Sequence, residues 1–492
     1  MINVYVSRFD KQKDSEPHIE CYEIEKTPGM KILDALKAIN EKYDADISYR
    51  SSCRAGQCGS CSVKINGNGA LACQKEIKDN DLIEPLDFPV IKDLIVDRSE
   101  IDEKVKDLHL NLEGYEKTDS LNETLTPQEL KDTKKVRQCI ECYSCLSTCP
   151  VVKYFKEEYG GPYFMRYLSK FDGDPRDMDD RLSESLKEGL FKCTSCGKCK
   201  SVCPKNINTF GDAILKFREE ACNNDKGPLP EHATFKDNIK KTGRSVLGKD
   251  SFVKDHNNKN KDNSKIALFT GCMVDKRTPQ VGEALVNVLK SNGINVEVPE
   301  GQVCCGSPLI NTGQTGEVQT LVDQNKEVFK DYDTVLTICA GCGNTLKNLH
   351  PNYGSELNVM DISEFLIDNL DYDKMKDLDM KVTWHDPCHL GRGQSIKDQP
   401  REIIENMNGV ELVEMKHPCQ CCGAGGGIKS GAPEIALKLA SEKAKMIKDT
   451  DADAVITICP FCQNNLRDGL DNEGLEDIKV MNILELLEKA YE

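Results

Sequence analysis

Cysteine is the residue type in this chain with the greatest capacity for chemistry. The 492 residues include 25 cysteines, and most of them recur at short, fixed spacings. The chain starts MINVYVSRFDKQKDSEPHIE, which lacks the apolar core of a signal peptide, so we expect a cytoplasmic protein. In a reducing compartment, cysteines in such numbers hold metal more often than they form disulfides. The sequence therefore predicts a metalloprotein.

The first cysteine group lies in SCRAGQCGSC and GALACQ. Its members are Cys53, Cys58, Cys61 and Cys73. The C-x4-C-x2-C spacing with a later fourth cysteine is that of a plant-type 2Fe–2S site. Gly56 and Gly59 let the loop backbone approach sulfur, where N–H groups stabilise an anionic cluster. Zinc also accepts four thiolates, but its usual knuckles are tighter than this glycine-rich loop.

Two further groups, CIECYSCLSTCP and CTSCGKCKSVCP, share the pattern C-x2-C-x2-C-x3-C-P. In two-cluster bacterial ferredoxins with this pattern, the fourth cysteine of each run ligates the other cluster. We therefore predict two 4Fe–4S clusters with exchanged fourth ligands. One would be held by Cys139, Cys142, Cys145 and Cys203, and the other by Cys149, Cys193, Cys196 and Cys199.

The remaining cysteine pattern occurs twice, and each copy ends in a similar phrase, TVLTICAGCGNTL or AVITICPFCQNNL. Each copy has five cysteines, including an adjacent pair followed by glycine in VCCGSP and QCCGAG. The two sets are Cys272, Cys304, Cys305, Cys339 and Cys342, then Cys388, Cys421, Cys422, Cys459 and Cys462. A cubane 4Fe–4S cluster needs four outer ligands, so an opened, non-cubane cluster with a bridging thiolate suits five better. Zinc or an ordinary cubane remains the alternative at these sites.

Four folded segments must position these cysteines. Residues 1–100 alternate apolar and polar positions in NVYVSRF and CSVKING, with the amphipathic stretch KILDALKAINEKY between them, which predicts a small α+β domain. Residues 120–235 have a helical pattern. Residues 236–264 include the polar segment KDHNNKNKDNSK and are predicted to be a linker.

The two repeats occupy residues 265–370 and 380–492 and open on the strand-like sequences KIALFTGC and KVTWHDPC. Each continues with a helical pattern and ends on the strand-like phrase that carries Cys-x-x-Cys. Strands alternating with helices predict a small α/β layer in each repeat, produced by duplication. The expected fold class is therefore multidomain α+β, with two duplicated α/β domains at its end.

Charge and hydropathy exclude several classes of partner. The formal charge of −17 argues against nucleic acid, and no basic block stands out. No apolar run approaches the ~20 residues of a membrane helix, so we expect no transmembrane anchor. Contact with a membrane through a partner stays open.

YRSSCRAGQCGSC, followed by the two Cys-Pro runs, resembles the iron–sulfur subunit of succinate dehydrogenases and fumarate reductases over residues 1–235. The resemblance implies a β-grasp 2Fe–2S domain, a helical two-cluster domain, and a separate flavoprotein partner of the same enzyme type that carries FAD. The chain departs from the family at Cys196, where many members have an apolar residue and a 3Fe–4S cluster. A cysteine there implies a 4Fe–4S cluster and weakens any transfer of the family's quinone site.

The repeats are similar to the CCG domains of the heterodisulfide reductase catalytic subunit, in which non-cubane 4Fe–4S clusters occur in pairs. Disulfide chemistry moves two electrons, whereas an iron–sulfur centre moves one at a time, so a pair of clusters has a chemical reason. The whole chain resembles the iron–sulfur subunit of the thiol:fumarate reductase (CoM/CoB) family. That resemblance implies a heterodimer that oxidises coenzyme M and coenzyme B to their heterodisulfide. Electrons would pass through the 4Fe–4S and 2Fe–2S centres to the flavoprotein, which reduces fumarate to succinate.

Two other functions fit the same motifs. The chain could serve a quinone-linked succinate dehydrogenase, with the repeats as anchor or quinone site. It could also be a pure electron carrier for a flavoprotein dehydrogenase, although carriers with ferredoxin and CCG parts lack the front 2Fe–2S domain. Thiol identity rests on the resemblance alone.

Several other residues near the motifs have weaker claims to a role. His389, next to Cys388, could exchange protons with a thiol or donate a hydrogen bond to cluster sulfur. The GAGGG segment at Gly423 could bind an anion, but close packing is the simpler interpretation. We expect Arg392 to be solvated.

Three cysteines lie outside the motifs. We expect Cys21 and Cys222 to be small buried hydrophobes. Cys419 lies close enough to Cys421 to stand in as a ligand.

Overall fold

The computed structural model describes residues 1–112, 126–249, 251–256 and 265–492. The chain forms two compact units, one of Met1–Leu190 with Gly197–Phe217 and the other of Phe191–Cys196 with Arg218–Glu492. The boundary therefore crosses the second Cys-Pro run. Over the described ranges, every helix is too short or too polar to cross a membrane.

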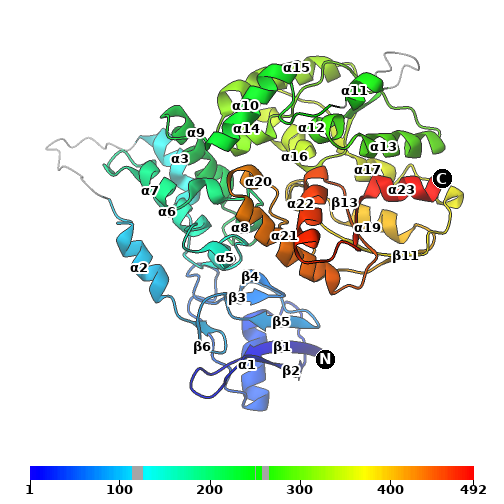
Figure 1. Cartoon of the computed structure of the whole chain (residues 1–492). Coiled ribbons are helices and arrows are strands. Elements are labelled where there is room, and N and C mark those ends of the chain that lie inside the picture. Colours follow the sequence, from blue (N-terminus) through cyan, green and yellow to red (C-terminus); the bar gives the residue numbers. More distant parts are fainter. Residues whose placement is uncertain (113–125, 250, 257–264) are drawn as a thin grey trace. The chain divides into compact units, whose positions relative to one another are not determined.

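The first unit begins with a five-stranded sheet of order β2-β1-β5-β3-β4 packed on one helix (Figure 1). These elements are β1 (Ile2–Arg8), β2 (His18–Ile24), β3 (Ser62–Ile65), β4 (Asn68–Leu71), β5 (Asp81–Glu84) and α1 (Ile32–Tyr43). The strands predicted in NVYVSRF and CSVKING and the helix predicted between them are confirmed as β1, β3 and α1. Val4 and Val6 of β1 and Leu36 of α1 are fully buried in the core that joins sheet and helix. A two-stranded sheet, β6 (Val90–Lys92) and β7 (Ile95–Val96), and α2 (Ser99–Asp107) follow.

The rest of the first unit is helical, as the sequence predicts for the described residues of 120–235; residues 120–125 lie outside the described ranges. Its helices are α3 (Pro127–Arg137), α4 (Ser144–Ser147), α5 (Val152–Phe155), α6 (Pro162–Asp172), α7 (Arg181–Lys187), α8 (Lys198–Ser201) and the π-helix η2 (Phe210–Ile214). The short helices α4 and α8 lie within the two Cys-Pro runs and pack against each other.

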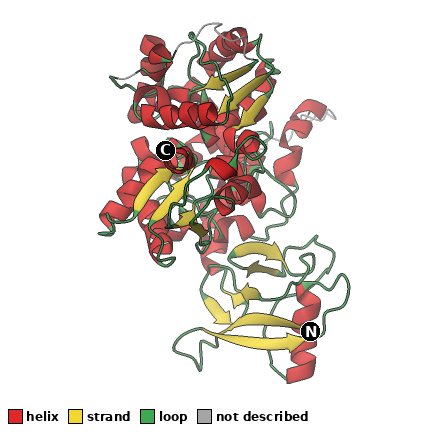
Figure 2. Ribbon diagram, turned by 90° about the vertical axis from the view of Figure 1, so that its right-hand side faces the viewer, coloured by secondary structure: helices red, strands yellow, loops and turns green. Residues whose placement is uncertain are grey.

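The second unit contains one parallel sheet in each repeat (Figure 2). The first, of order β10-β9-β8, consists of β8 (Ile266–Phe269), β9 (Thr334–Thr337) and β10 (Val359–Asp361). The second, of order β12-β11-β13-β14, consists of β11 (Met380–Trp384), β12 (Val410–Leu412), β13 (Ala454–Thr457) and β14 (Lys479–Asn482). The strands that precede Cys-x-x-Cys, β9 and β13, are interior strands. Their continuous apolar sequences match this position, because a parallel sheet is covered on both faces.

Helices surround both sheets. In the first repeat these are α12 (Gly271–Lys276), α13 (Pro279–Ser291), α14 (Ser307–Asn311), α15 (Val318–Phe329), α16 (Ala340–Asn348) and α17 (Ile362–Leu366). In the second they are α18 (Cys388–Gly391), α19 (Asp398–Glu405), α20 (Ile428–Gly431), α21 (Pro433–Lys448), α22 (Pro460–Asn472) and α23 (Ile483–Tyr491). The predicted α/β alternation is present in each repeat.

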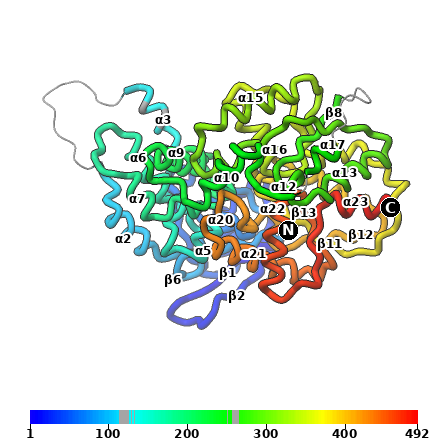
Figure 3. The backbone as a smooth tube through the Cα atoms, turned by 45° about the horizontal axis from the view of Figure 1, so that its top comes forward, coloured from blue at the N-terminus to red at the C-terminus, as the bar shows by residue number. Residues whose placement is uncertain are grey.

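The two repeats share one hydrophobic core. Phe269 and Leu336 of the first repeat and Trp384 and Ile456 of the second belong to a single cluster of buried side chains. Helix α13 packs against α23 (Figure 3). The repeats therefore form one body, which fixes the position of one cysteine set relative to the other.

Part of the segment expected to be a linker, residues 236–264, is helical. Helices α9 (Leu215–Asn223) and α10 (Pro230–Thr242) precede the repeats, so α10 extends into this segment, and Phe252–Asp255 form α11. Residue 250 and residues 257–264 lie outside the described ranges. Helix α10 and the residues after it belong to the second unit and contribute to its cavity.

Candidate functional site

A cavity of about 370 Å³ lies within the second unit and is lined by the cysteines of both repeats. Those from the first are Cys272, Cys304, Cys305, Cys339 and Cys342, and those from the second are Cys388, Cys421, Cys422, Cys459 and Cys462. All 25 cysteines of the chain lie in the described ranges and none forms a disulfide. The structure thus brings together the ten cysteines that the sequence groups only by pattern.

The Cys-x-x-Cys motifs reach the cavity because each follows the carboxyl end of a parallel strand. Cys339 is the N-cap of α16 after β9, and Cys459 is the N-cap of α22 after β13. Cys342 and Cys462 lie in the first turns of the same helices. The free N–H groups and positive dipole end of a helix N-terminus favour thiolates and the anionic clusters they bind.

A tight turn orients each adjacent cysteine pair. The following glycine has a positive φ, 84° at Gly306 and 93° at Gly423. Each glycine donates its N–H to the first sulfur of the pair, over 3.4 Å to Cys304 and 3.3 Å to Cys421. At Gly423 a Cβ would also lie 2.7 Å from the Ala436 carbonyl oxygen of α21. The positive φ therefore favours glycine after each cysteine pair, and at Gly423 a larger residue would also collide with the backbone of α21.

The two sulfur sets face each other. Within the first repeat, Cys305 Sγ lies 3.5 Å from Cys342 Sγ. Across the repeats, the thiols of Cys339 and Cys459 lie close enough to shift each other's pKa. This contact joins the two N-capping cysteines, so a molecule between the repeats would meet sulfur from both.

The crowded thiols perturb one another's ionisation. The pKa of Cys305 is lowered by hydrogen bonding from Cys304 and then Cys342, and that of Cys422 by hydrogen bonding from Cys462. The partner thiols Cys342 and Cys462 have raised pKa values for the same reason. So many buried thiolates require positive charge nearby, and iron bound by sulfur supplies it. The donor set therefore fits iron–sulfur clusters.

Arg392 lies against the second cysteine set, and the expectation that it is solvated is wrong. Its guanidinium donates to the carbonyl oxygens of Cys196 (2.7 Å) and Cys419 (2.6 Å) and to Cys388 Sγ (2.8 Å). The thiol of Cys388 raises the Arg392 pKa against the opposing effect of burial. Arg392 therefore joins a predicted 4Fe–4S ligand segment to Cys388, a predicted ligand of the second repeat.

His389 lies at the same junction. Its Nε2 donates to the Ser195 carbonyl oxygen over 3.2 Å, and the residue lines the cavity. A Cβ added to Gly341 would lie 3.8 Å from His389 Nδ1. One ring nitrogen is thus bound to the Cys193–Cys196 segment, while the other lies near the first repeat.

The GAGGG segment packs closely against the same loop. A Cβ at Gly425 would lie 2.8 Å from the Thr194 carbonyl oxygen, and one at Gly426 would lie 2.4 Å from that of Cys193. These contacts agree with the close-packing interpretation. No side chain larger than hydrogen fits between the two backbones.

A buried cation also contributes to the second repeat. Lys443 of α21 donates to the carbonyl oxygens of His417 (2.8 Å) and Pro418 (2.9 Å), and burial lowers its pKa to about 8. Sequence reasoning missed Lys443, because it lies on a helix far along the chain from its partners.

The cysteines predicted for the first 4Fe–4S cluster line one small cavity in the first unit. They are Cys139, Cys142, Cys145 and Cys203, and Cys199, which is predicted for the second cluster, lines the same cavity. Arg166, only 4% exposed, lines the same cavity, and its Nε and Nη2 have no hydrogen-bond partner among the described residues. A buried guanidinium with unused donors beside these thiols suits an anionic cluster.

The cysteines predicted for the second 4Fe–4S cluster are divided by the boundary between the units. Cys149 and Cys199 belong to the first unit, and Cys193 and Cys196 to the second. Cys193 Sγ accepts a hydrogen bond from the Ser195 N–H over 3.4 Å, as expected of a ligand loop that wraps sulfur with amides. This ligand set remains a prediction.

The four cysteines predicted for the 2Fe–2S cluster gather in the first unit. Cys53 lies close enough to Cys58, and Cys73 close enough to Cys61, to influence the pKa of Cys58 and of Cys61. Cys53 Sγ also accepts N–H groups of residues 55 and 57, at 3.4 and 3.3 Å. Hydrogen bonding from Ser60 lowers the pKa of Cys58 to about 6. Backbone N–H groups and Ser60 of this loop therefore stabilise thiolate sulfur, in line with the prediction from the glycine-rich sequence.

This loop touches the first Cys-Pro run within the same unit. A Cβ at Gly59 would lie 2.5 Å from the Ile140 carbonyl oxygen and 3.1 Å from Cys142 Cβ. Lys205 also donates to Gln57 over 2.9 Å. The predicted 2Fe–2S site and the first 4Fe–4S site are therefore neighbours.

The three cysteines outside the motifs differ from one another. Cys21 is exposed, so the expectation that it is buried is wrong. Cys222 is partly buried and its thiol donates to the Thr312 carbonyl oxygen over 3.5 Å. Cys419 donates to Asp386 Oδ2 over 3.3 Å and does not line the cavity.

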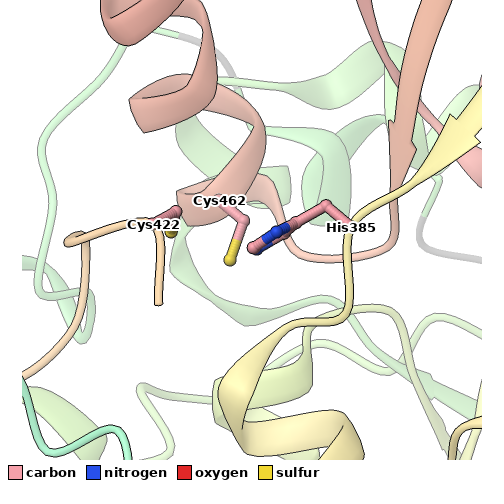
Figure 4. A group of neighbouring side chains, drawn as sticks. All are labelled: His385, Cys422 and Cys462. Carbon is pink, nitrogen blue, oxygen red and sulfur yellow. The ribbon is translucent and has the colours of Figure 1, made fainter. Parts of the chain in front are cut away.

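Sequence reasoning also missed His385, which lies beside two cysteines of the second repeat (Figure 4). One ligand atom from each of His385, Cys422 and Cys462 lies within 4.8 Å of the other two, and all three residues are buried. Aligning HDPC of the second repeat with FTGC of the first would have indicated His385, because a histidine stands there in place of a phenylalanine.

Comparison with known families agrees with this organisation. A 2Fe–2S iron–sulfur cluster binding domain matches residues 3–103, and a 4Fe–4S dicluster domain matches residues 135–207. The cysteine-rich (CCG) domain matches twice, at residues 266–347 and 382–467.

Relatives of known name extend the likeness. One subunit of the fumarate reductase (CoM/CoB) of Methanothermobacter marburgensis is 55% identical, over 100% of this chain and 99% of the relative. One subunit of the dihydromethanophenazine:CoB–CoM heterodisulfide reductase of Methanosarcina acetivorans is 34% identical, over 72% of this chain and 93% of the relative. A solved structure of a hypothetical protein from Helicobacter pylori aligns with a TM-score of 0.65 at 13% identity, over 100% of this chain and 94% of that one, which is a likeness of fold alone.

Proposed function

Because the chain belongs to the family of this fumarate reductase (CoM/CoB) subunit, we propose that it oxidises two thiols, coenzyme M and coenzyme B, to a heterodisulfide. The electrons then pass to a flavoprotein partner that carries FAD and reduces fumarate to succinate. The observation that carries this proposal is the single cavity that all ten repeat cysteines line.

The reaction balances without an additional oxidant. Two thiols lose two protons and two electrons as one S–S bond forms. Fumarate gains two protons and two electrons as its double bond becomes single. When bound by the ten cysteines, non-cubane 4Fe–4S clusters would supply iron that can take a thiol sulfur and carry electrons one at a time.

The protein itself positions the two thiols. The contact between Cys339 and Cys459 brings the two cysteine sets close enough for two substrate sulfurs to meet between them. Arg277 and Lys429 contribute cationic side chains to the cavity lining, which suits sulfonate or phosphate groups on the thiols. His389, held at Nε2 by Ser195, is placed to take a proton from a thiol.

The proposed electron route follows the cysteine groups back along the chain. Arg392 and His389 contact the Cys196 and Ser195 carbonyl oxygens, which links the second repeat to the second Cys-Pro run. The contact of Gly59 with Cys142 supports the last step, from the first 4Fe–4S site to the 2Fe–2S site.

The test uses the complete heterodimer under anaerobic conditions. We expect incubation with coenzyme M, coenzyme B and fumarate to form heterodisulfide and succinate in equal amounts. Iron, sulfide and zinc are measured on the same preparation. Quinone reduction without any response to thiols would contradict the proposal, as would zinc in place of iron at the repeats.

Substitution of Arg392 tests the link between the second repeat and the Cys-Pro run. We expect Arg392→Gln to lower thiol-dependent fumarate reduction about tenfold or more, because charged hydrogen bonds contribute ~1.5–3 kcal/mol each. Arg392→Lys should not restore the rate, since an ammonium cannot span three acceptors.

The control for Arg392 is Lys445→Gln on an exposed position of α21, which should keep full activity. Iron content must stay at the level of the unmodified complex. A normal rate in Arg392→Gln would show that this contact is not needed.

A further inference from the structure

His385 places a buried imidazole against the second cysteine set. It is 0% exposed, and neither ring nitrogen makes a hydrogen bond of ordinary geometry with the described residues. In Figure 4 its ring extends from the loop after β11 toward Cys462 Sγ, with Cys422 beside it. A fully buried polar group without a partner is costly, so its position requires an explanation.

The surrounding contacts hold His385 in place. Its backbone N–H donates to the Ile456 carbonyl oxygen of the neighbouring strand over 2.9 Å. The next residue, Asp386, accepts from Trp384 Nε1 at 2.8 Å and from both terminal nitrogens of Arg401 at 3.0 Å. These contacts fix the backbone of His385 and the side chain of Asp386, and the imidazole lies beside the two thiols.

The first repeat has an apolar residue at the position that matches His385. Phe269, the last residue of β8, occupies the matching position three residues before the first cysteine of the repeat. Phe269 and Cys342 both lie near Gly271: from a Cβ built at Gly271, Phe269 Cε1 would be 4.0 Å away and Cys342 Sγ 3.0 Å. Cys342 corresponds to Cys462, so an apolar ring in one repeat replaces an imidazole in the other.

We propose that His385 donates a hydrogen bond to thiolate sulfur of the second cluster, at Cys422 or Cys462, and that the two clusters therefore differ in reduction potential. This inference rests on the proposed function, because it assumes a cluster in each repeat. His385 is a positioning residue in this role and contacts ligand sulfur rather than substrate.

The direction of the difference follows from charge. Reduction adds negative charge that spreads onto the thiolates, and a donated N–H stabilises it. His385 therefore raises the potential of the second cluster relative to one without the donor. A hydrogen bond of ordinary strength changes the equilibrium constant about tenfold, which is ~59 mV for one electron.

The experiment exchanges the two aligned residues in the complete heterodimer. Redox titration followed by electron paramagnetic resonance is performed on His385→Phe, on Phe269→His and on the unmodified complex. We expect His385→Phe to lower the reduction potential of the cluster in the second repeat. The decrease should correspond to about a tenfold change in the equilibrium constant for its reduction. Phe269→His should raise the other, while the 2Fe–2S and ferredoxin-type centres serve as unchanged references.

A conservative variant separates hydrogen bonding from packing. His385→Gln keeps an N–H donor and should recover part of the lost potential. An unchanged reduction potential in His385→Phe with full iron content would overturn the proposal. Loss of iron from that variant alone would also overturn it, because His385 would then be a direct ligand of the cluster. Zinc or no metal at the repeats of the unmodified complex would instead overturn the proposed function on which this inference rests.

Discussion

Replacement of Cys305 or Cys422 by alanine is expected to abolish thiol oxidation while fumarate reduction from an artificial electron donor continues. Each is the second cysteine of an adjacent pair, buried and in contact with a cysteine of the Cys-x-x-Cys motif in its repeat. Loss of a residue that only supports a metal ligand commonly lowers metal affinity or activity ~10–100-fold, so loss of a ligand itself should lower activity more than ~100-fold. Heterodisulfide formation and donor-driven succinate formation are measured on the same preparation.

Two other cysteines provide matched controls. Cys21→Ala removes an exposed thiol, and Cys419→Ala removes one that donates to Asp386 outside the cavity. Both should retain thiol oxidation. If Cys305→Ala kept its thiol activity, the assignment of the adjacent pairs to the reaction would be wrong.

Replacement of Cys203 by alanine is expected to have the complementary effect. Cys203 shares a cavity with Cys139, Cys142 and Cys145, although it lies at least 58 positions after each of them in the sequence. Loss of this ligand should remove one 4Fe–4S centre and break the route to the flavoprotein. Thiol oxidation with an artificial electron acceptor should persist, whereas thiol-dependent fumarate reduction should fall ~100-fold or more.

Cys222→Ala is the control for this variant, because its thiol donates to a backbone carbonyl and lies outside every predicted ligand set. Spectra of the remaining 4Fe–4S centre should be unchanged in Cys203→Ala. If Cys203→Ala still reduced fumarate with electrons from the thiols, the assignment of Cys203 to the first 4Fe–4S cluster would be wrong.

The cysteine groups could be predicted from the sequence because their chemistry is local. Spacing between predicted ligands such as Cys139 and Cys142 is typical of a short loop that wraps a cluster, and it does not depend on the rest of the fold. The duplicated phrases at Thr334 and Ala454 likewise predicted the strands β9 and β13 and the helices α16 and α22 that follow them. Apolar runs followed by a glycine or proline near Cys-x-x-Cys suffice for that inference.

Other features depended on contacts between distant residues. The burial of Arg392 comes from the carbonyl oxygens of Cys196 and Cys419, and nothing near Arg392 in the sequence indicates them. Cys21 is exposed because it lies on β2, an edge strand of the sheet, where its side chain points away from the core. Local pattern cannot assign the face of a short strand with so few apolar residues.

Ligand spacing in the chain was enough to predict which sulfur atoms belong together, since it is a property of short segments. The folded arrangement was needed to show that both repeats line one cavity and that the His385 side chain is buried beside Cys422 and Cys462. The reason is that parallel strands from separate parts of the chain end at a common edge, and a shared core fixes one repeat against the other.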